Sequence, residues 1–260
     1  MPTFALKLSY DGKPFCGFAR QPGMLTVQGE LEHALEMLYR RPVQTVCAGR
    51  TDSGVHALGQ VVSFDLTEDE AGIRRDDALM RSLNALTHDR MSVCEVLHPQ
   101  EGFSARFDAK AREYRYFIAN TSYPPLVMGD FSWQITSPLD IGAMREGASY
   151  LIGEHDFKSF CMAASAVGKP TCRNVHEISF AQEEVMGERA VVITVKGNAF
   201  LHSMVRTIVG TLVMVGRGQR KPEWVADVLQ ACDRCAAGEN APAAGLVFWN
   251  VSYDGVRDHI

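Results

Sequence analysis

The sequence predicts an α+β fold built from two successive sets of strands and helices. Residues 3–10 and 246–253 of the 260-residue chain alternate apolar with smaller or polar side chains, as strands buried on one face do. Between them, each half follows roughly the order β-α-β-(β)-α-β, with strands meeting mostly as antiparallel neighbours. The simplest assembly is two ferredoxin-like halves, residues 1–102 and 103–260, that share a central, mostly antiparallel sheet with the helices outside.

In the first half, four strands and two helices are expected. The strands are residues 3–10, 44–48, 58–66 and 91–97. One helix, capped by Thr26, carries apolar residues on one face at Val27, Leu31, Ala34, Leu35 and Leu38, and the other carries Leu79, Leu83 and Leu86. Residues 67–77 are charged and poor in apolar side chains, so we expect an exposed connection there.

The second half is expected to contain a hairpin and a deeply buried helix. Its strands are residues 112–119, 175–181, 190–195 and 246–253, with residues 183–189 linking the middle two. Residues 202–215 are apolar nearly all round, which is typical of a buried helix. Asp140 precedes another helix, and Pro222 suits the first turn of a third. Residues 163–172 contain Gly, Pro, Ser and Lys and are expected to form a loop.

Composition favours a soluble globular protein in the cytoplasm. Hydrophobic residues make up 46% and charged residues 22%, and the net charge is −5, which argues against a protein that is basic over its whole surface. A local basic cleft remains compatible with that charge, because the field in a cleft depends on how charges are distributed. No apolar run approaches the roughly 20 residues that a membrane helix needs. The N-terminus leads directly into the first strand pattern, so we expect no signal peptide.

The seven cysteines are scattered in sequence, which favours reduced thiols over a disulfide framework. Cys232 and Cys235 form a lone Cys-x-x-Cys pair within a helical pattern. A zinc site needs four converging ligands, and no second Cys or His pair lies near these two. We therefore expect neither a bound metal nor a cofactor.

The loop of residues 47–56 carries the strongest candidate for chemistry. Gly49 and Gly54 bracket Arg50 and Asp52, with strand-like segments on both sides. Glycines allow a sharply bent turn and close approach of another backbone. From these residues alone, Arg50 and Asp52 are either a structural ion pair that closes the loop or part of a catalytic site, since catalytic groups concentrate on such loops.

The motifs of the chain, in their order, resemble those of the TruA-type tRNA pseudouridine synthases. The central one is Ala48-Gly49-Arg50-Thr51-Asp52-Ser53-Gly54-Val55-His56, followed by Gly59-Gln60-Val61-Val62. The others are Ser9-Tyr10-Asp11-Gly12, Phe15-Cys16-Gly17-Phe18, Phe103-Ser104-Ala105-Arg106-Phe107, Arg112-Glu113-Tyr114-Arg115-Tyr116 and Asn198-Ala199-Phe200-Leu201-His202-Ser203-Met204-Val205-Arg206. The resemblance extends from about Leu6 to Tyr253, and it implies RRM-like halves with a catalytic cleft between them.

The resemblance implies an active site centred on Asp52. In this family the matching carboxylate either attacks the sugar carbon or removes a sugar proton, and both routes help the base to leave. Arg50 and Arg206 match positions beside that carboxylate, and Tyr114 matches a tyrosine that stacks on the target base. Leu246 matches an apolar wall of the pocket.

Structural roles remain open for several of these residues. Arg206 could form a purely structural pair, and Leu246 could be a core leucine. A purely structural role, as an aromatic side chain that faces inward from a strand, suits Tyr116 better than it suits Tyr114. For His56, a structural role in a tight turn is favoured over chemistry, because the reaction needs little external acid-base catalysis.

The resemblance further implies tRNA as the partner, with uridines 38, 39 and 40 of the anticodon stem-loop as targets, and a homodimer that holds one tRNA. Arg115 and Lys169 are expected to contact substrate. The wider set of basic candidates is Arg20, Arg74, Arg75, Lys110, Arg112, Arg173, Arg217, Arg220 and Lys221. An alternative is an RNA-binding or RNA-chaperone protein that has lost catalysis. A metal-dependent hydrolase is a third reading, but Asp52 lacks neighbours with ligand spacing. Ser53 and Phe18-Ala19-Arg20 depart from the common Ala and Trp-Gln-Arg of the family, and Ala19 bears on the range of target sites.

Overall fold

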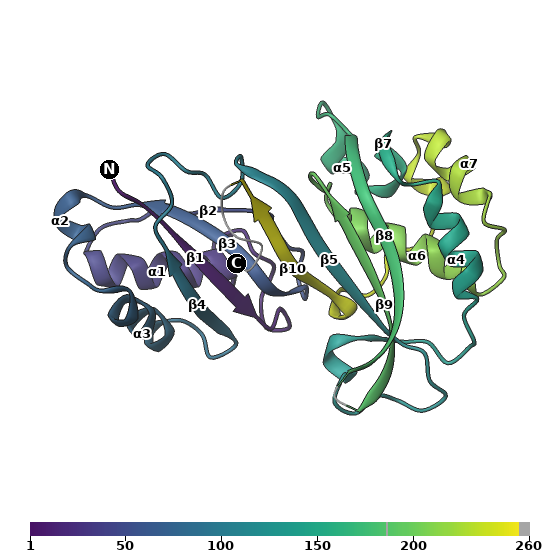
Figure 1. Cartoon of the computed structure of the whole chain (residues 1–260), viewed down its shortest axis with the longest axis horizontal. Coiled ribbons are helices and arrows are strands. Elements are labelled where there is room, and N and C mark those ends of the chain that lie inside the picture. The colour runs from purple at the N-terminus through teal and green to yellow at the C-terminus, as the bar shows by residue number, and fades with distance from the viewer. Residues whose placement is uncertain (186, 255–260) are drawn as a thin grey trace. The chain divides into compact units, whose positions relative to one another are not determined.

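The computed structural model describes residues 1–185 and 187–254, and only the backbone of residues 165 and 166. The chain forms two compact units (Figure 1). Unit 1 comprises Met1–Arg112 and the segment from Phe248 onward, and unit 2 comprises Glu113–Val247. The last six residues of the predicted second half, 255–260, lie outside the described residues, as does residue 186 in the predicted hairpin connection.

Unit 1 is built on strands in the order β4-β1-β3-β10, with the short strand β2 beside β3. The bounds are β1 Thr3–Tyr10, β2 Val46–Cys47, β3 His56–Asp65, β4 Met91–Leu97 and β10 Leu246–Tyr253. Strand β1 pairs antiparallel with both β3 and β4, so that Leu6 lies opposite Val62 on one side and Val96 on the other. The predicted bounds of β1, β4 and β10 are confirmed. Strand β3 begins two residues earlier than predicted, which brings His56 into the sheet.

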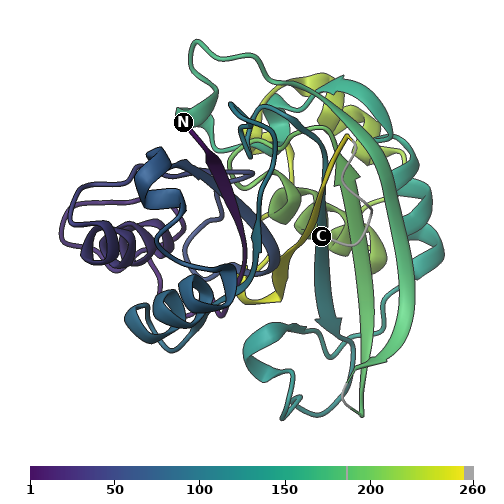
Figure 2. The ribbon, with the colours of Figure 1, turned by 60° about the vertical axis from the view of Figure 1, so that its left-hand side comes forward.

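The helices of unit 1 are α1 Val27–Tyr39, α2 Glu68–Ala71 and α3 Asp76–Leu86. Thr26 caps α1 as predicted, because its side-chain oxygen accepts a hydrogen bond from the Gly29 backbone N–H at 3.3 Å. Helices α1 and α3 lie on the same side of the strands (Figure 2). The predicted connection at 67–77 is exposed but contains α2, a single turn that Thr67 and Glu70 stabilise with a reciprocal capping box.

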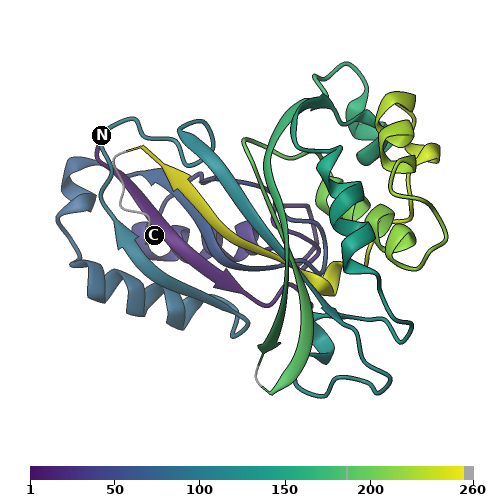
Figure 3. The same cartoon turned by 45° about the vertical axis from the view of Figure 1, so that its right-hand side comes forward.

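Unit 2 has its strands in the order β5-β9-β8-β7, with β6 parallel to β5. The bounds are β5 Ala109–Ala119, β6 Trp133–Gln134, β7 Gly153–Asp156, β8 Cys172–Val185 and β9 Glu188–Gly197. Strands β8 and β9 form the long antiparallel hairpin seen in Figure 3. The predicted hairpin is confirmed, and both strands extend beyond the predicted ranges. Strands β6 and β7 were not predicted.

The helices of unit 2 are α4 Ile141–Ser149, α5 Ala163–Ala166, α6 Met204–Gly216 and α7 Trp224–Ala231. One-turn 3₁₀ helices occur at Gly129–Phe131, Lys158–Phe160, Arg234–Ala236 and Ala243–Gly245. Helix α6 is buried along nearly its whole length, as its apolar sequence predicts, and it contacts α4. The short helix α5 lies in the predicted loop at 163–172. Among the described residues, no helix is both long and apolar enough to cross a membrane.

Candidate active site

The loop that carries Asp52 connects β2 to β3 in unit 1 and is fixed at both ends. The Asp52 carbonyl accepts a hydrogen bond from Val55 N–H at 3.2 Å, and Gly54 between them has a φ of 78°, a conformation that favours glycine. Further back, the side-chain amide of Gln60 donates to the Gly49 carbonyl at 2.6 Å. Asp52 is half-buried and Arg50 is exposed. The turn therefore holds Asp52 in place by backbone contacts on both sides.

A second loop, residues 11–18, packs directly against the first. The carbonyl of Thr51 accepts from Phe18 N–H at 3.0 Å, and the Ser53 hydroxyl donates to the Phe15 carbonyl at 3.2 Å. These two bonds flank Asp52 on either side in sequence. A Cβ at Gly12 would lie 2.1 Å from the Val55 carbonyl oxygen, so only glycine allows this approach.

Buried polar side chains also link the Asp52 loop to the end of β1 and to the turn that follows it. The Tyr10 hydroxyl lies 2.9 Å from Thr51 Oγ1, and burial raises the pKa of Tyr10, so the phenol stays protonated. His56 is buried, and its Nδ1 accepts from Gly12 N–H at 3.0 Å and lies 3.2 Å from Asp11 Oδ1. These contacts support the structural reading of His56, because its ring joins the start of β3 to the Gly12 turn.

Arg112 ties the Asp52 loop to residues 103–108. Its guanidinium is buried and donates from Nε and Nη2 to the Ala48 carbonyl, at 3.1 and 3.0 Å. Nη2 also donates to the Arg106 carbonyl at 2.6 Å, and Nη1 donates to Ala109 at 3.2 Å. The prediction that Arg112 belongs to a basic surface is therefore wrong. A guanidinium offers five N–H donors in a rigid fork, which suits three carbonyls from different parts of one unit.

Replacing Arg112 with Met is expected to lower the free energy of unfolding by about 1.5–3 kcal/mol, because buried carbonyls lose a charged donor. Urea denaturation followed by circular dichroism measures this. Lys110→Met is the matched control, since Lys110 lies two residues earlier and its 58% exposed side chain pairs with Asp254 on the surface. Equal effects of the two substitutions would contradict the role assigned to Arg112.

Cys47, at the entrance to the loop, is excluded as a nucleophile. Burial raises the pKa of its thiol to about 11, although the nearby Arg50, Arg106 and Arg112 act in the opposite direction. The thiol is therefore protonated at neutral pH and lacks the thiolate form that reacts. Asp52 is left as the candidate for covalent or proton-transfer chemistry on this loop.

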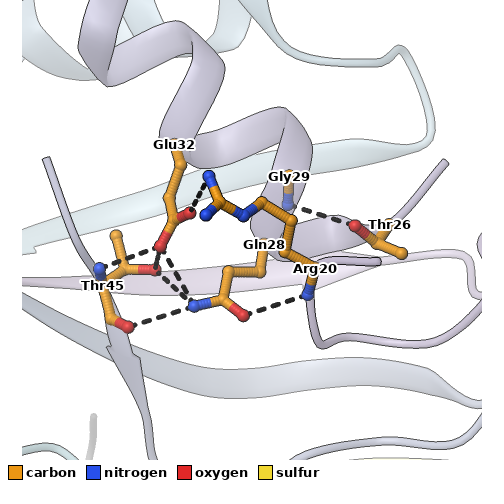
Figure 4. Close-up of polar contacts among 6 residues, drawn as sticks. All are labelled: Arg20, Thr26, Gln28, Gly29, Glu32 and Thr45. Carbon is orange, nitrogen blue, oxygen red and sulfur yellow. Dashed lines mark hydrogen bonds and ion pairs between the residues drawn. The ribbon is translucent and has the colours of Figure 1, made fainter. Parts of the chain in front are cut away.

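The segment around Thr45, which leads into β2 and then the Asp52 loop, is held by the polar network in Figure 4. The Gln28 side chain accepts from Arg20 N–H at 3.1 Å and donates to the Thr45 carbonyl at 3.1 Å. Glu32 accepts from both the backbone N–H and the hydroxyl of Thr45, each at 3.0 Å, and lies 3.5 Å from the exposed Arg20 guanidinium. Helix α1 thus connects Arg20 to the segment that enters β2.

Tyr114 and Arg206 belong to unit 2. Tyr114, on β5, is buried and packs edge-on against Phe200, with ring centroids 5.2 Å apart. Arg206, in the first turn of α6, donates from Nε to the Ala241 carbonyl at 2.8 Å, while its own carbonyl accepts from Ala241 N–H at 3.0 Å. These contacts fix the orientation of both side chains within unit 2.

The remaining predicted residues of unit 2 differ in their surroundings. Leu246 is 5% exposed at the start of β10, which is also what a core leucine would show. The Arg115 guanidinium donates from Nε to Glu113 at 3.0 Å, whereas Lys169 is exposed. Tyr116 is fully buried, and its hydroxyl donates to the Pro242 carbonyl at 2.8 Å. Tyr116 therefore has the structural role of a buried strand aromatic, as expected from the sequence.

Comparison with known proteins assigns the chain to a family. Residues 148–254 match the family model described as tRNA pseudouridine synthase. The chain is 43% identical to a tRNA pseudouridine synthase A of Brevibacillus brevis, over 95% of this chain and 97% of the relative. It is 41% identical to that of Bacillus subtilis, over 95% and 97%, and 40% identical to that of Colwellia psychrerythraea, over 96% and 93%. The chain belongs to the tRNA pseudouridine synthase A family.

Proposed function

We propose that this protein is an isomerase that converts uridine to pseudouridine in the anticodon stem-loop of tRNA, at positions 38, 39 and 40. The observation that carries the proposal is the near full-length identity of about 40% to relatives named tRNA pseudouridine synthase A. The intact Arg50, Asp52, Tyr114 and Arg206 weigh against a protein that binds RNA without catalysis.

Asp52 is the proposed catalytic carboxylate. In the reaction the bond between N1 of uracil and the sugar breaks, the base turns, and C5 bonds to the sugar carbon, with loss of the C5 proton to water and gain of a proton at N1. A carboxylate that attacks the sugar carbon or removes a sugar proton assists departure of the base. A rigidly mounted carboxylate favours such a step, because a displaced catalytic group costs much of the rate. The hydrogen bonds around Thr51, Ser53 and Val55 support this role.

The other proposed residues bind or orient the target nucleotide. Arg50 is proposed to orient the carboxylate, and Arg206 occupies a family position assigned to the same role. Tyr114 stacks on the uracil ring, and Leu246 forms an apolar wall against it. The fixed orientation of Tyr114 against Phe200 suits a stacking surface. These roles follow from the positions that the residues occupy in the family motifs.

The proposed assembly is a cytoplasmic homodimer that holds one tRNA along a basic cleft. A single chain of net charge −5 is not basic over its whole surface, whereas two chains together supply a longer basic cleft. Lys169 and Arg115 are proposed phosphate contacts, and Lys169 is the more accessible because Glu113 pairs with Arg115. We also propose that each sequence half, 1–102 and 103–260, is ferredoxin-like and that the catalytic cleft lies between the halves.

The decisive experiment uses unmodified tRNA labelled with tritium at uracil C5. Isomerisation releases this tritium to water, so we expect release by the wild-type protein without added nucleotide. Binding of the tRNA without release, across a broad tRNA pool, would support the RNA-binding or chaperone alternative and overturn the proposed activity.

A further inference from the structure

The segment of residues 103–108 is a rigid loop in unit 1. Its centre is Ala105, which is fully buried. The Ala105 N–H donates to the Ser63 hydroxyl at 3.0 Å, and its carbonyl accepts from the Tyr253 hydroxyl at 2.7 Å. Phe103 packs edge-on against Tyr253, with ring centroids 5.0 Å apart. Strands β3 and β10 therefore hold the loop from both sides.

This rigid loop presents an aromatic side chain to solvent. Phe107 is 79% exposed, and the Arg106 guanidinium lies 5.5 Å from the centre of its ring. The backbone at Phe107 is itself held, since its N–H donates to the Ser104 hydroxyl at 3.4 Å. One exposed apolar side chain is ordinary in a folded protein. An exposed aromatic ring beside a guanidinium, on a loop whose backbone is held by hydrogen bonds, is suited to stacking with a nucleobase.

The same loop is joined to the loop that carries Asp52. The Arg112 guanidinium bonds at once to the Arg106 carbonyl and to Ala48, four residues before Asp52. Arg50 and Arg106 both lie close enough to lower the pKa of the buried Cys47 thiol, against the larger effect of burial. Each of the two loops therefore carries an arginine in the neighbourhood of Cys47.

We propose that Phe107 and Arg106 form a second nucleotide-binding surface, on which Phe107 stacks with an unpaired base of the tRNA and Arg106 contacts a neighbouring phosphate. This inference rests on the proposed function, since it needs tRNA as the partner. The occupant is a nucleotide outside the catalytic pocket, because Tyr114 is the residue assigned to the target uracil. The positive charge at Arg106 favours RNA over an apolar protein surface as the occupant.

Equilibrium binding of unmodified tRNA tests the stacking. Phe107→Ala and Phe107→Leu are expected to weaken binding about 5- to 150-fold, the range found when stacking aromatics are removed, whereas Phe107→Tyr retains it. The slope of log affinity against log salt stays unchanged in Phe107→Ala, while Arg106→Ala reduces it by about one. The kcat/KM of Phe107→Ala is expected to fall by about the same factor as its affinity for tRNA, because the lost interaction is made on binding.

A fluorescent variant separates stacking on RNA from contact with a second copy of the chain. In Phe107→Trp, the additional indole emission is expected to fall on addition of tRNA and to be independent of protein concentration in its absence. A dependence on protein concentration without RNA would assign the ring to a protein interface and overturn the proposal. Because Phe107 is mostly exposed, these variants are expected to fold like the wild type, which circular dichroism checks.

Tyr123→Ala is the matched control, since Tyr123 is another exposed aromatic, at 59%. Equal losses of affinity in Tyr123→Ala and Phe107→Ala, or wild-type affinity in Phe107→Ala and Phe107→Leu, would overturn the proposal. If the wild type releases tritium in those cases, only the Phe107 surface fails. If the wild type binds tRNA without any release, the proposed activity fails and the binding results still decide the role of Phe107.

Discussion

Replacing Asp52 with Asn is expected to lower tritium release by about 10⁴-fold or more, the order of loss seen when a catalytic nucleophile is removed. Asn keeps the size of the side chain and its capacity for hydrogen bonds but cannot supply a negative charge. Single-turnover release from labelled tRNA measures the effect. The affinity for tRNA should change little, because phosphate contacts elsewhere on the protein dominate binding.

Ser53→Ala is the control for this substitution. Ser53 is the next residue and is exposed, and the loss of its hydroxyl bond to the Phe15 carbonyl should leave most of the activity, because the backbone bonds of Thr51 and Val55 remain. Turnover by Asp52→Asn within tenfold of the wild type would remove Asp52 from its catalytic role. A matching loss in Ser53→Ala would indicate that the geometry of the loop, and not the charge of Asp52, limits the reaction.

Replacing Gly12 with Ala is expected to damage both stability and activity. The added Cβ would meet the Val55 carbonyl oxygen at 2.1 Å and its carbon at 2.5 Å, so one of the two loops must move. Overpacking of this kind costs about 1–3 kcal/mol in the free energy of unfolding. Since Val55 lies three residues after Asp52, a shift of about 1 Å in this loop should lower turnover about 100-fold.

Gly72→Ala is the matched control for Gly12→Ala. Gly72 ends α2 with a φ of −84°, and the nearest atom to an added Cβ is 4.0 Å away. Urea denaturation and tritium release should both stay near wild type. Wild-type turnover in Gly12→Ala would show that the loop tolerates the shift and that the close approach does not position Asp52.

Much of the fold is predictable because its signals are local. Thr26 and the apolar spacing of Val27, Leu31 and Leu35 specify α1 without reference to the rest of the chain. The ends of β8 and β9 were missed for the opposite reason. Residues 182–184 are polar and pair with residues 189–191 beyond the apolar stretch, so only the cross-strand partner shows that the strands continue. Strands β6 and β7 are too short to display an alternation.

For the candidate site, too, features with a local sequence signal were predicted, and features that depend on contacts between distant segments were not. Asp52, Arg50, Tyr114 and Arg206 were identified by motif, and their roles stay predictions. The function of Arg112 could not be read from its residue type, because most charged residues near strand ends are solvated and its acceptor at Ala48 lies 64 residues away. Gly12 appeared in the sequence only as part of a motif, because its requirement for glycine comes from Val55, a contact between distant segments.

The hydrogen bonds that the Arg112 guanidinium donates to backbone carbonyls make the geometry of the Asp52 loop insensitive to pH and ionic strength, two conditions that affect RNA binding. A guanidinium stays charged over the whole working pH range, and its partners here are carbonyl oxygens, which do not titrate. The contact is buried, so dissolved ions screen it far less than they screen phosphate contacts at the surface. Changes in pH or ionic strength should therefore alter how much tRNA is bound and leave intact the position from which Asp52 acts.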